Sequence, residues 1–200
     1  LQMGQVEVED QLRGVDFLKG LDWVDSDRLG VFGHSYGGYM TIMCMARAPE
    51  VFKAGVSVAP VSQWELYDTH YTERFLSTPK ANPTGYEASS VFPYLDNLHG
   101  ELLLMHGMAD DNVLFTHSTK LYKALQDRGI ETIGMLDVPP DAEQAQYEVR
   151  GRRDLVAAQL FRNQATWQPL LEPVMTRMTL KVRRWQLGAD RDHSFLGRPR

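Results

Sequence analysis

Ser35 lies in the string Gly33-His34-Ser35-Tyr36-Gly37, between a short apolar run and a dense run of helix-forming residues. A G-x-S-x-G string at a strand-to-helix turn is typical of a nucleophile elbow, which lifts the serine Oγ above the sheet edge. Both flanking glycines are expected to be required, because side chains there would collide with the neighbouring strand and helix. The N–H of Tyr36 then stands at a helix start, where it can stabilise an oxyanion. The pattern predicts covalent catalysis by Ser35, the alternative being an ordinary glycine-rich turn.

A catalytic serine needs a base, and the base needs an orienting carboxylate; in this class of fold the order along the chain is Ser, Asp, His. The stretch 102–107 predicts a later strand and its turn, and the loop 108–112 leaves that strand at the carboxyl edge of the sheet. Asp110 and Asp111 are both candidates for the acid, the alternative being a pair of loop-capping residues. His34 is expected to be a packed histidine whose side chain points away from the Ser35 Oγ.

Short apolar runs that alternate with helical patterns must position these loops. Such an alternation predicts an α/β fold with a mostly parallel sheet and helices on both faces. The helices are expected within residues 8–18, 40–48 and 116–126, and the strands at 29–32, 54–58, 102–105 and 133–136.

Composition and charge limit the function classes. The 200 residues are 43% apolar with a net charge of −5, and no run of Lys and Arg interleaves with aromatic residues, so neither a nucleic acid nor an anionic membrane is indicated as partner. Cys44 is the only cysteine, which excludes an intrachain disulfide framework and a cysteine-based zinc site. The start LQMGQVEVEDQ lacks the pattern of a signal peptide, and because the chain begins at Leu1 we expect a fragment of a longer protein.

The composition changes near residue 137. Residues 1–136 carry 10 basic and 18 acidic side chains, whereas residues 137–200 carry 11 basic and 8 acidic ones, with repeated prolines and no sustained period. We therefore predict a division into 1–136, part of the α/β domain, and 137–200, an atypical Arg-, Gln- and Pro-rich tail. The tail is expected to be out of register with the preceding fold or disordered, and a small helical appendage is the alternative.

Three separated strings, GHSYGGYM, PVSQWELYDTHYTERF and LLLMHGMADDNVLF, give residues 4–136 a resemblance to catalytic domains of the prolyl oligopeptidase family of serine peptidases, in its dipeptidyl peptidase branch. The resemblance implies a partial α/β-hydrolase fold and a serine-type dipeptidyl peptidase that releases N-terminal dipeptides after Pro or Ala through an acyl-enzyme. It also implies that Ser35 is the nucleophile, the Tyr36 N–H part of the oxyanion hole, and Asp110 the triad carboxylate. No metal or organic cofactor is implied, and the histidines lack metal-ligand spacing.

The same resemblance implies a substrate site. Asn112 would hold the carbonyl of the penultimate residue, and a hydrophobic pocket for proline would be formed by Tyr36, Val61, Trp64, Tyr67, Tyr71 and Val113. A proline ring offers a flat apolar face and no N–H, so an aromatic box suits it. Steps of three and four between Trp64, Tyr67 and Tyr71 predict one helical face, for which a plain core stripe is the alternative.

The chain departs from the family pattern at the catalytic histidine. Residues 137–146 contain no His where the family places one, and His117 and His193, which follow Asp110, do not match the family spacing. We therefore expect the isolated chain to be inactive. The parent protein is expected to act on peptides with Pro or Ala in second place, to form a homodimer, and to be periplasmic, secreted or membrane-anchored. A non-catalytic partner-binding relative and another peptidase of the family are the alternatives.

Overall fold

The computed structural model describes residues 1–108, 110–137 and 185–187, and the side chains of 1–108 and 110–132. The strands expected at 29–32, 54–58, 102–105 and 133–136 lie within strands of the structure, and the helices expected within 8–18, 40–48 and 116–126 coincide with helices, the second of which ends at Arg47. In chain order the elements are α1 (Gln5–Lys19), β1 (Leu29–His34), α2 (Tyr36–Arg47), β2 (Phe52–Val58), the 3-10 helix η1 (Trp64–Leu66), α3 (Thr69–Leu76), α4 (Pro83–Ser89), the 3-10 helix η2 (Phe92–Asn97), β3 (Glu101–Gly107), α5 (Thr116–Asp127), β4 (Thr132–Asp137) and β5 (Trp185–Leu187).

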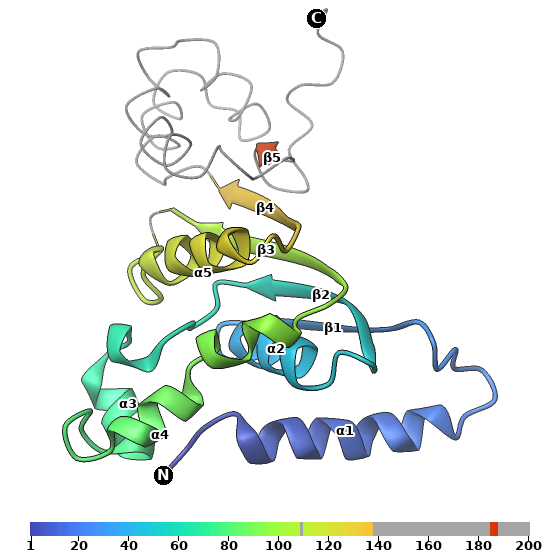
Figure 1. Ribbon diagram of the computed structural model, residues 1–200, viewed down its shortest axis with the longest axis horizontal. Coiled ribbons are helices and arrows are strands. Elements are labelled where there is room, and N and C mark those ends of the chain that lie inside the picture. The colour runs from blue at the N-terminus through green and yellow to red at the C-terminus, as the bar shows by residue number, and fades with distance from the viewer. Residues whose placement is uncertain (109, 138–184, 188–200) are drawn as a thin grey trace, which may run out of the picture.

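The strands form a parallel sheet in the order β1-β2-β3-β4-β5 (Figure 1). The predicted parallel sheet is therefore confirmed. Because successive parallel strands end at the same edge, the turns after β1, β2 and β3 meet there. β5 lies in the predicted tail and pairs with β4; the rest of residues 138–200, including the predicted helical stretch, lies outside the described residues.

One face of the sheet is packed by α2 and α5. The Ser57 hydroxyl donates to the carbonyl of Gly38 in α2 at 2.9 Å, and the Tyr122 hydroxyl of α5 donates to the Leu104 carbonyl at 3.0 Å. Ser57 and Leu104 are neighbours in the β2–β3 register, so their side chains point to the same face. This face is buried, and α1 packs on the outside of α2.

The opposite face is more open within the described part of the chain. Phe32 points to this face and is 73% exposed, while its register neighbours Val56 and Leu103 are half-buried. The helices that pack on the sheet within residues 1–137, α2 and α5, thus cover one of the two faces that the sequence predicts to be covered. None of these helices has both the length and the apolar run that a membrane span requires.

The segment between β2 and β3 leaves the sheet and carries the aromatic residues. It contains η1, α3, α4 and η2, and it extends beyond the carboxyl edge in Figure 1. Trp64 anchors it: the indole is 1% exposed, and its Nε1–H donates to the Ser89 carbonyl of α4 at 3.0 Å. Asp68 and Asn82 begin α3 and α4 by accepting hydrogen bonds from the backbone N–H groups of Tyr71 and Gly85.

Candidate active site

Ser35 sits in a strained turn between β1 and α2. Its backbone has φ 59° and ψ −118°, a conformation that L-residues with a side chain rarely adopt and that costs roughly 1–3 kcal/mol. The turn is held by the Ser35 N–H, which donates to the Val58 carbonyl at 2.8 Å, and by the Ser35 carbonyl, which accepts from the Tyr39 N–H at 3.0 Å. The strand-turn-helix context predicted for a nucleophile elbow is therefore present around Ser35.

The glycines around the elbow are not equivalent. A Cβ on Gly33 would lie 2.2 Å from the Gly37 carbonyl oxygen, and a Cβ on Gly38 would lie 2.5 Å from the Val58 oxygen. A Cβ on Gly37 would meet nothing within 4 Å. The expectation that both Gly33 and Gly37 are required by collisions is thus correct for Gly33 and wrong for Gly37; the second tight position is Gly38, where α2 crosses the end of β2.

The Tyr36 N–H is the first backbone donor of α2. The first N–H groups of an α-helix have no intrahelical acceptor, and Ser35 caps this helix with no side-chain hydrogen bond. The donor therefore stands beside the nucleophile with the positive end of the helix dipole behind it. This geometry suits the predicted oxyanion role, which stays a prediction.

His34 is exposed at the end of β1. The expectation of a packed histidine is wrong, because this residue points to the open face of the sheet, the face that Phe32 also occupies. Within the described residues, Ser35 Oγ forms no hydrogen bond with His34 or with any other side chain.

Asp110 lies in the loop after β3, with its side chain 24% exposed. Its Oδ1 accepts from the backbone N–H groups of Asn112 at 3.0 Å and Val113 at 2.9 Å. The carboxylate therefore caps the loop, which is the role that the sequence allowed as the alternative to catalysis. Its second oxygen, Oδ2, remains available for a further partner. Asp111 is exposed. Of the two candidate acids, Asp110 is the one whose position is fixed by the loop.

His106, a buried residue of β3, supports the Asp110 loop from the protein interior. It is buried, with Nε2 2.7 Å from the Val113 carbonyl, Nδ1 2.7 Å from the Ser118 hydroxyl, and Nε2 3.5 Å from Asp110 Oδ2. Because a carbonyl only accepts, Nε2 carries the proton and Nδ1 accepts from Ser118. Burial lowers the pKa of His106, so the ring is held neutral. Motif spacing does not identify this residue; its place one position before Gly107, where β3 ends, is the only sequence signal.

Ser35 and Asp110 lie at the same edge of the sheet. The Ser35 N–H bonds to Val58 at the end of β2, and the next residue, Ala59, donates to the Met105 carbonyl of β3 at 2.8 Å. β1 and β3 are therefore two positions apart, about 10 Å between their axes. A bridging side chain is needed to connect the serine to the acid, which is the place of the histidine in a triad.

Two histidines, His117 and His193, follow Asp110 in the sequence and are candidates for the bridging side chain. His117 is 0% exposed, and its Nδ1 accepts from the Ser62 N–H at 3.1 Å. Burial lowers the pKa of His117 to about 4, and its lone pair faces the Ser62 backbone, so it is a structural histidine. His193 lies outside the described residues.

Aromatic side chains gather around Trp64, next to the elbow. The Trp64 ring centroid is 5.8 Å from Tyr36, 6.0 Å from Tyr67 and 6.1 Å from Tyr71, and the last pair is stacked with an interplanar angle of 17°. Tyr67 and Tyr71 are in edge contact at 5.5 Å. We refer to Tyr36, Trp64, Tyr67 and Tyr71 as the aromatic cluster.

The prediction that Trp64, Tyr67 and Tyr71 share one helical face is wrong. Trp64 belongs to η1, Tyr67 is extended with φ −98° and ψ 165°, and Tyr71 belongs to α3. Asp68 interrupts the helical course because its side chain caps α3. The three rings nevertheless meet, since the extended residue folds α3 back towards η1.

Of the other predicted pocket residues, Val61 and Val113 belong to the same hydrophobic core as Trp64. Val61 and Val113 are each 2% exposed. Asn112 is exposed, and its Oδ1 accepts from the Tyr67 hydroxyl at 3.1 Å, which leaves its Nδ2 donors for another acceptor. Tyr67 thereby links the aromatic cluster to the Asp110 loop.

Glu7 completes the cluster from α1. One carboxylate oxygen accepts from the Tyr36 hydroxyl, and the other accepts from the Gly4 N–H at 2.9 Å. This contact joins residues 29 positions apart, and the spacing of Gly4 and Glu7 signals only a helix start.

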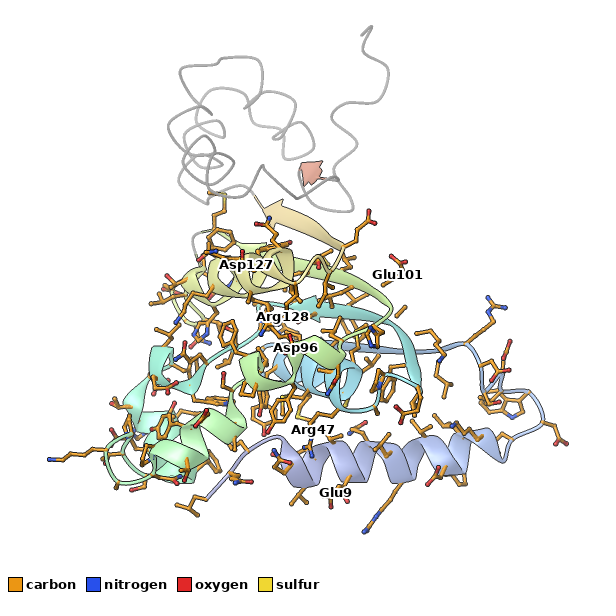
Figure 2. All side chains as sticks on the ribbon, in the orientation of Figure 1. Glu9, Arg47, Asp96, Glu101, Asp127 and Arg128 are labelled. Atoms are coloured by element: carbon orange, nitrogen blue, oxygen red, sulfur yellow. The ribbon has the colours of Figure 1, made fainter. Side chains whose placement is uncertain are left out.

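A separate hollow of about 570 Å³ lies at the amino edge of the sheet, on the side opposite Ser35. It is lined by the start of β3 and the end of α5, and Asp96 and Arg128 form an ion pair at 2.5 Å beside it (Figure 2). None of the predicted site residues lines it.

The fold and the elbow together define a class. A parallel sheet whose strand ends in a strained serine followed by a helix, with a carboxylate at the same edge, is the arrangement of an α/β-hydrolase. The model of the prolyl oligopeptidase family matches residues 1–155, and the chain belongs to that family. The family resemblance expected from the three strings is therefore confirmed.

Curated relatives of the chain include dipeptidyl peptidases. The chain is 44% identical over 133 residues to dipeptidyl peptidase 4 of Bos taurus, covering 65% of this chain and 17% of the relative. It is 41% identical over 147 residues to a probable dipeptidyl-aminopeptidase B of Neurospora crassa, covering 72% and 16%.

Solved structures give the same result. A putative dipeptidyl aminopeptidase IV from Bacteroides ovatus matches with a TM-score of 0.67 and 40% identity, covering 69% of this chain and 19% of that one. Porphyromonas gingivalis dipeptidyl peptidase 4 matches with a TM-score of 0.66 and 37% identity, covering 75% and 22%. The chain thus spans between 16% and 22% of the length of these relatives.

Proposed function

We propose that this chain is the nucleophile-bearing part of a serine-type dipeptidyl peptidase that releases N-terminal dipeptides after Pro or Ala. The observation that carries the proposal is the strained backbone of Ser35, at φ 59°, beside an aromatic cluster. Strain of this size persists only where the surrounding structure enforces it, and such positions concentrate at functional sites. The similarity to dipeptidyl peptidases supports the choice of reaction.

In the proposed reaction, Ser35 Oγ attacks the carbonyl carbon of the second substrate residue. The serine proton passes to a histidine, which then donates it to the departing amine, while the oxyanion accepts from the Tyr36 N–H. Asp110 Oδ2 orients that histidine, because Oδ1 is already bonded to the loop. Water then hydrolyses the acyl-enzyme and releases the dipeptide. The histidine must come from outside the described residues, or from another part of the parent protein.

The aromatic cluster supplies the proposed selectivity. A proline ring at the second position would pack against Tyr36, Trp64 and Tyr71, with Val61 and Val113 closing the sides, and alanine would fit the same space with fewer contacts. The Nδ2 group of Asn112, whose orientation is set by Tyr67, would donate to the carbonyl of the first substrate residue.

A non-catalytic partner-binding protein is the second candidate. The observation that favours it is that, in the described part of the chain, Ser35 Oγ has no histidine partner. The strained serine favours the enzyme, because relaxation of the turn would relieve strain in a protein with no use for it.

The remaining proposals concern the parent protein and rest on family similarity. It would act on peptides and not on nucleic acid, form a homodimer, and work in the periplasm, outside the cell or anchored to a membrane.

Labelling with a fluorophosphonate probe tests the proposed function, because the probe reports an activated serine without assuming a substrate. The 200-residue chain, its Ser35→Ala variant and a Ser77→Ala control are compared, since Ser77 also has a positive φ of 62° but lies outside the elbow. We expect the isolated chain to label weakly or not at all, and the full-length parent protein to label strongly with loss in Ser35→Ala only. A parent protein that folds and does not label would overturn the catalytic proposal in favour of the partner-binding one.

A further inference from the structure

The carboxylate of Glu7 is shared between a helix start and the aromatic cluster. Its two oxygens accept from the Gly4 N–H and from the Tyr36 hydroxyl, so the side chain has no rotational freedom left. The residues around it are fixed as well: the Tyr39 hydroxyl donates to the Met3 carbonyl at 3.0 Å, and the Met3 N–H donates to the Ser89 hydroxyl at 2.9 Å. The first turn of α1 is therefore a rigid support behind the cluster.

Tyr36 depends on this support more than its neighbours do. Trp64 is held by its own bond to Ser89, and Tyr67 by its bond to Asn112, whereas the hydroxyl of Tyr36 has Glu7 as its partner. The Tyr36 ring touches Tyr39 edge-on at 5.4 Å and Trp64 at 5.8 Å, contacts that are non-directional compared with the hydrogen bond of its hydroxyl.

The charge of Glu7 also reaches the other tyrosines. Burial raises the pKa of Tyr36, and the hydrogen bond to Glu7 adds to the rise; the same carboxylate contributes to the raised pKa values of Tyr39 and Tyr71. A hydroxyl that donates to a carboxylate makes a stronger bond than one that donates to a neutral group. Glu7 thus holds the Tyr36 hydroxyl towards α1.

We propose that Glu7 is a positioning residue for substrate selectivity: by holding the Tyr36 hydroxyl, it sets the width of the aromatic cluster that receives a proline ring. The inference rests on the proposed function, since it assumes that the cluster is the proline pocket. Glu7 touches no reacting atom, so its effect falls on the preference for a ring and not on the chemistry at Ser35.

Ligand binding tests this without any need for turnover. Saturation-transfer NMR gives the affinities of the 200-residue chain for alanyl-pyrrolidide and for alanyl-diethylamide, two amides with four carbons on a tertiary nitrogen that differ in ring closure. The chain is compared with Glu7→Gln, Tyr36→Phe, the double variant and Glu9→Gln. Glu9 lies two residues further along α1, where it is exposed, and serves as the matched charge control (Figure 2).

We expect the native chain and Glu9→Gln to prefer the pyrrolidide. Glu7→Gln loses the charge and has one acceptor oxygen for two donors, the Gly4 N–H and the Tyr36 hydroxyl, so it should lose about fivefold of that preference, the equivalent of one net hydrogen bond. Tyr36→Phe removes the hydroxyl but keeps the Gly4 bond of Glu7, so it should lose the same amount of preference while the variant stays folded. The double variant should lose no more than either single one, because both remove one interaction.

Two results would overturn the inference, and they are distinguishable. If the native chain prefers the pyrrolidide and folded Glu7→Gln and Tyr36→Phe keep that preference, Glu7 has no role in selectivity and the proposed function stands. If the native chain itself shows no preference, the assignment of the cluster as a proline pocket fails, and the inference about Glu7 fails with it.

Discussion

The carboxylate of Asp110 accepts a hydrogen bond from the backbone N–H of Val113 at 2.9 Å, so the proposed triad acid also fixes a wall of the proposed pocket. The loop is closed from the other side by His106, whose Nε2 donates to the Val113 carbonyl at 2.7 Å. The acid and the pocket therefore cannot move independently. A change at Asp110 that removes the Oδ1 acceptor is expected to disturb substrate binding as well as catalysis. A replacement that keeps this acceptor should spare the pocket.

Asp110→Ala is predicted to destabilise the fold, whereas Asp110→Asn is not. Alanine leaves the N–H groups of Asn112 and Val113 without their acceptor, at a cost of about 2 kcal/mol, or about 4 to 8 °C in melting temperature. Asparagine keeps an oxygen in the Oδ1 position while removing the charge. Thermal unfolding of both variants, with Asp111→Ala as the exposed control, checks this. Equal melting temperatures for Asp110→Ala and Asp111→Ala would show that the loop does not depend on the carboxylate.

Gly33→Ala and Gly37→Ala should differ in stability although both alter the same motif. At Gly33 the new methyl group would lie 2.2 Å from a backbone oxygen, which cannot give way, so a loss of about 2 to 3 kcal/mol is expected. At Gly37 the space is open and the backbone is helical, so we expect no loss and a gain of up to about 1 kcal/mol. Urea unfolding of the two variants gives both free energies of unfolding. A larger loss for Gly37→Ala would contradict the structure of the elbow.

Removing the strain at Ser35 should stabilise the chain. Both serine and alanine pay for a φ of 59° and ψ of −118°, while glycine adopts such angles at little steric cost. After subtraction of the greater entropy that glycine loses on folding, Ser35→Gly is predicted to be about 1 kcal/mol more stable than Ser35→Ala. The comparison of melting temperatures of these two variants tests the strain itself, because neither keeps the hydroxyl. A Ser35→Ala variant as stable as Ser35→Gly would mean that the turn is relaxed.

Features that depend on neighbouring residues in the chain were predictable, and features that depend on distant ones were not. The elbow at Ser35 and the alternation of strands and helices follow from short-range patterns, and both are present. The course of Trp64, Tyr67 and Tyr71 was mispredicted, because the capping bond of Asp68 overrides a helical spacing. The contact of Glu7 with Tyr36 spans 29 positions and leaves no local signal.

The two histidines buried near the site also illustrate this limit. His106 and His117 look alike in the sequence, since each stands close to the acid loop. Their roles are decided by contacts that folding creates: His106 bonds to Ser118 and the Val113 carbonyl, and His117 to the Ser62 backbone. Only the three-dimensional arrangement separates loop supports from a catalytic base.

The stability of the chain is predicted to fall as the pH decreases from about 6.5 to 4, owing to His117. In the folded chain burial lowers the pKa of His117 to about 4, whereas in the unfolded chain it takes the ordinary value of 6.5. Between pH 4 and pH 6.5 the unfolded chain binds a proton that the folded chain does not. Acid therefore favours unfolding, and the free energy of unfolding increases with pH across this range. The full effect is about 2 to 3 kcal/mol at pH 4. Below the folded pKa both forms are protonated and no further loss from this group is expected.

His117→Asn is the variant that isolates this contribution, because its Oδ1 can accept from the Ser62 N–H without titrating. Urea unfolding at several pH values between 4 and 7 should give a shallower slope for His117→Asn than for the native chain, and the variant His99→Asn, at an exposed position, serves as the control. The variant should be less stable than the native chain at pH 7, where its smaller side chain leaves a gap, and should approach or exceed it at pH 4. Parallel pH profiles for the native chain and His117→Asn would show that His117 takes up its proton in the folded chain as readily as in the unfolded one.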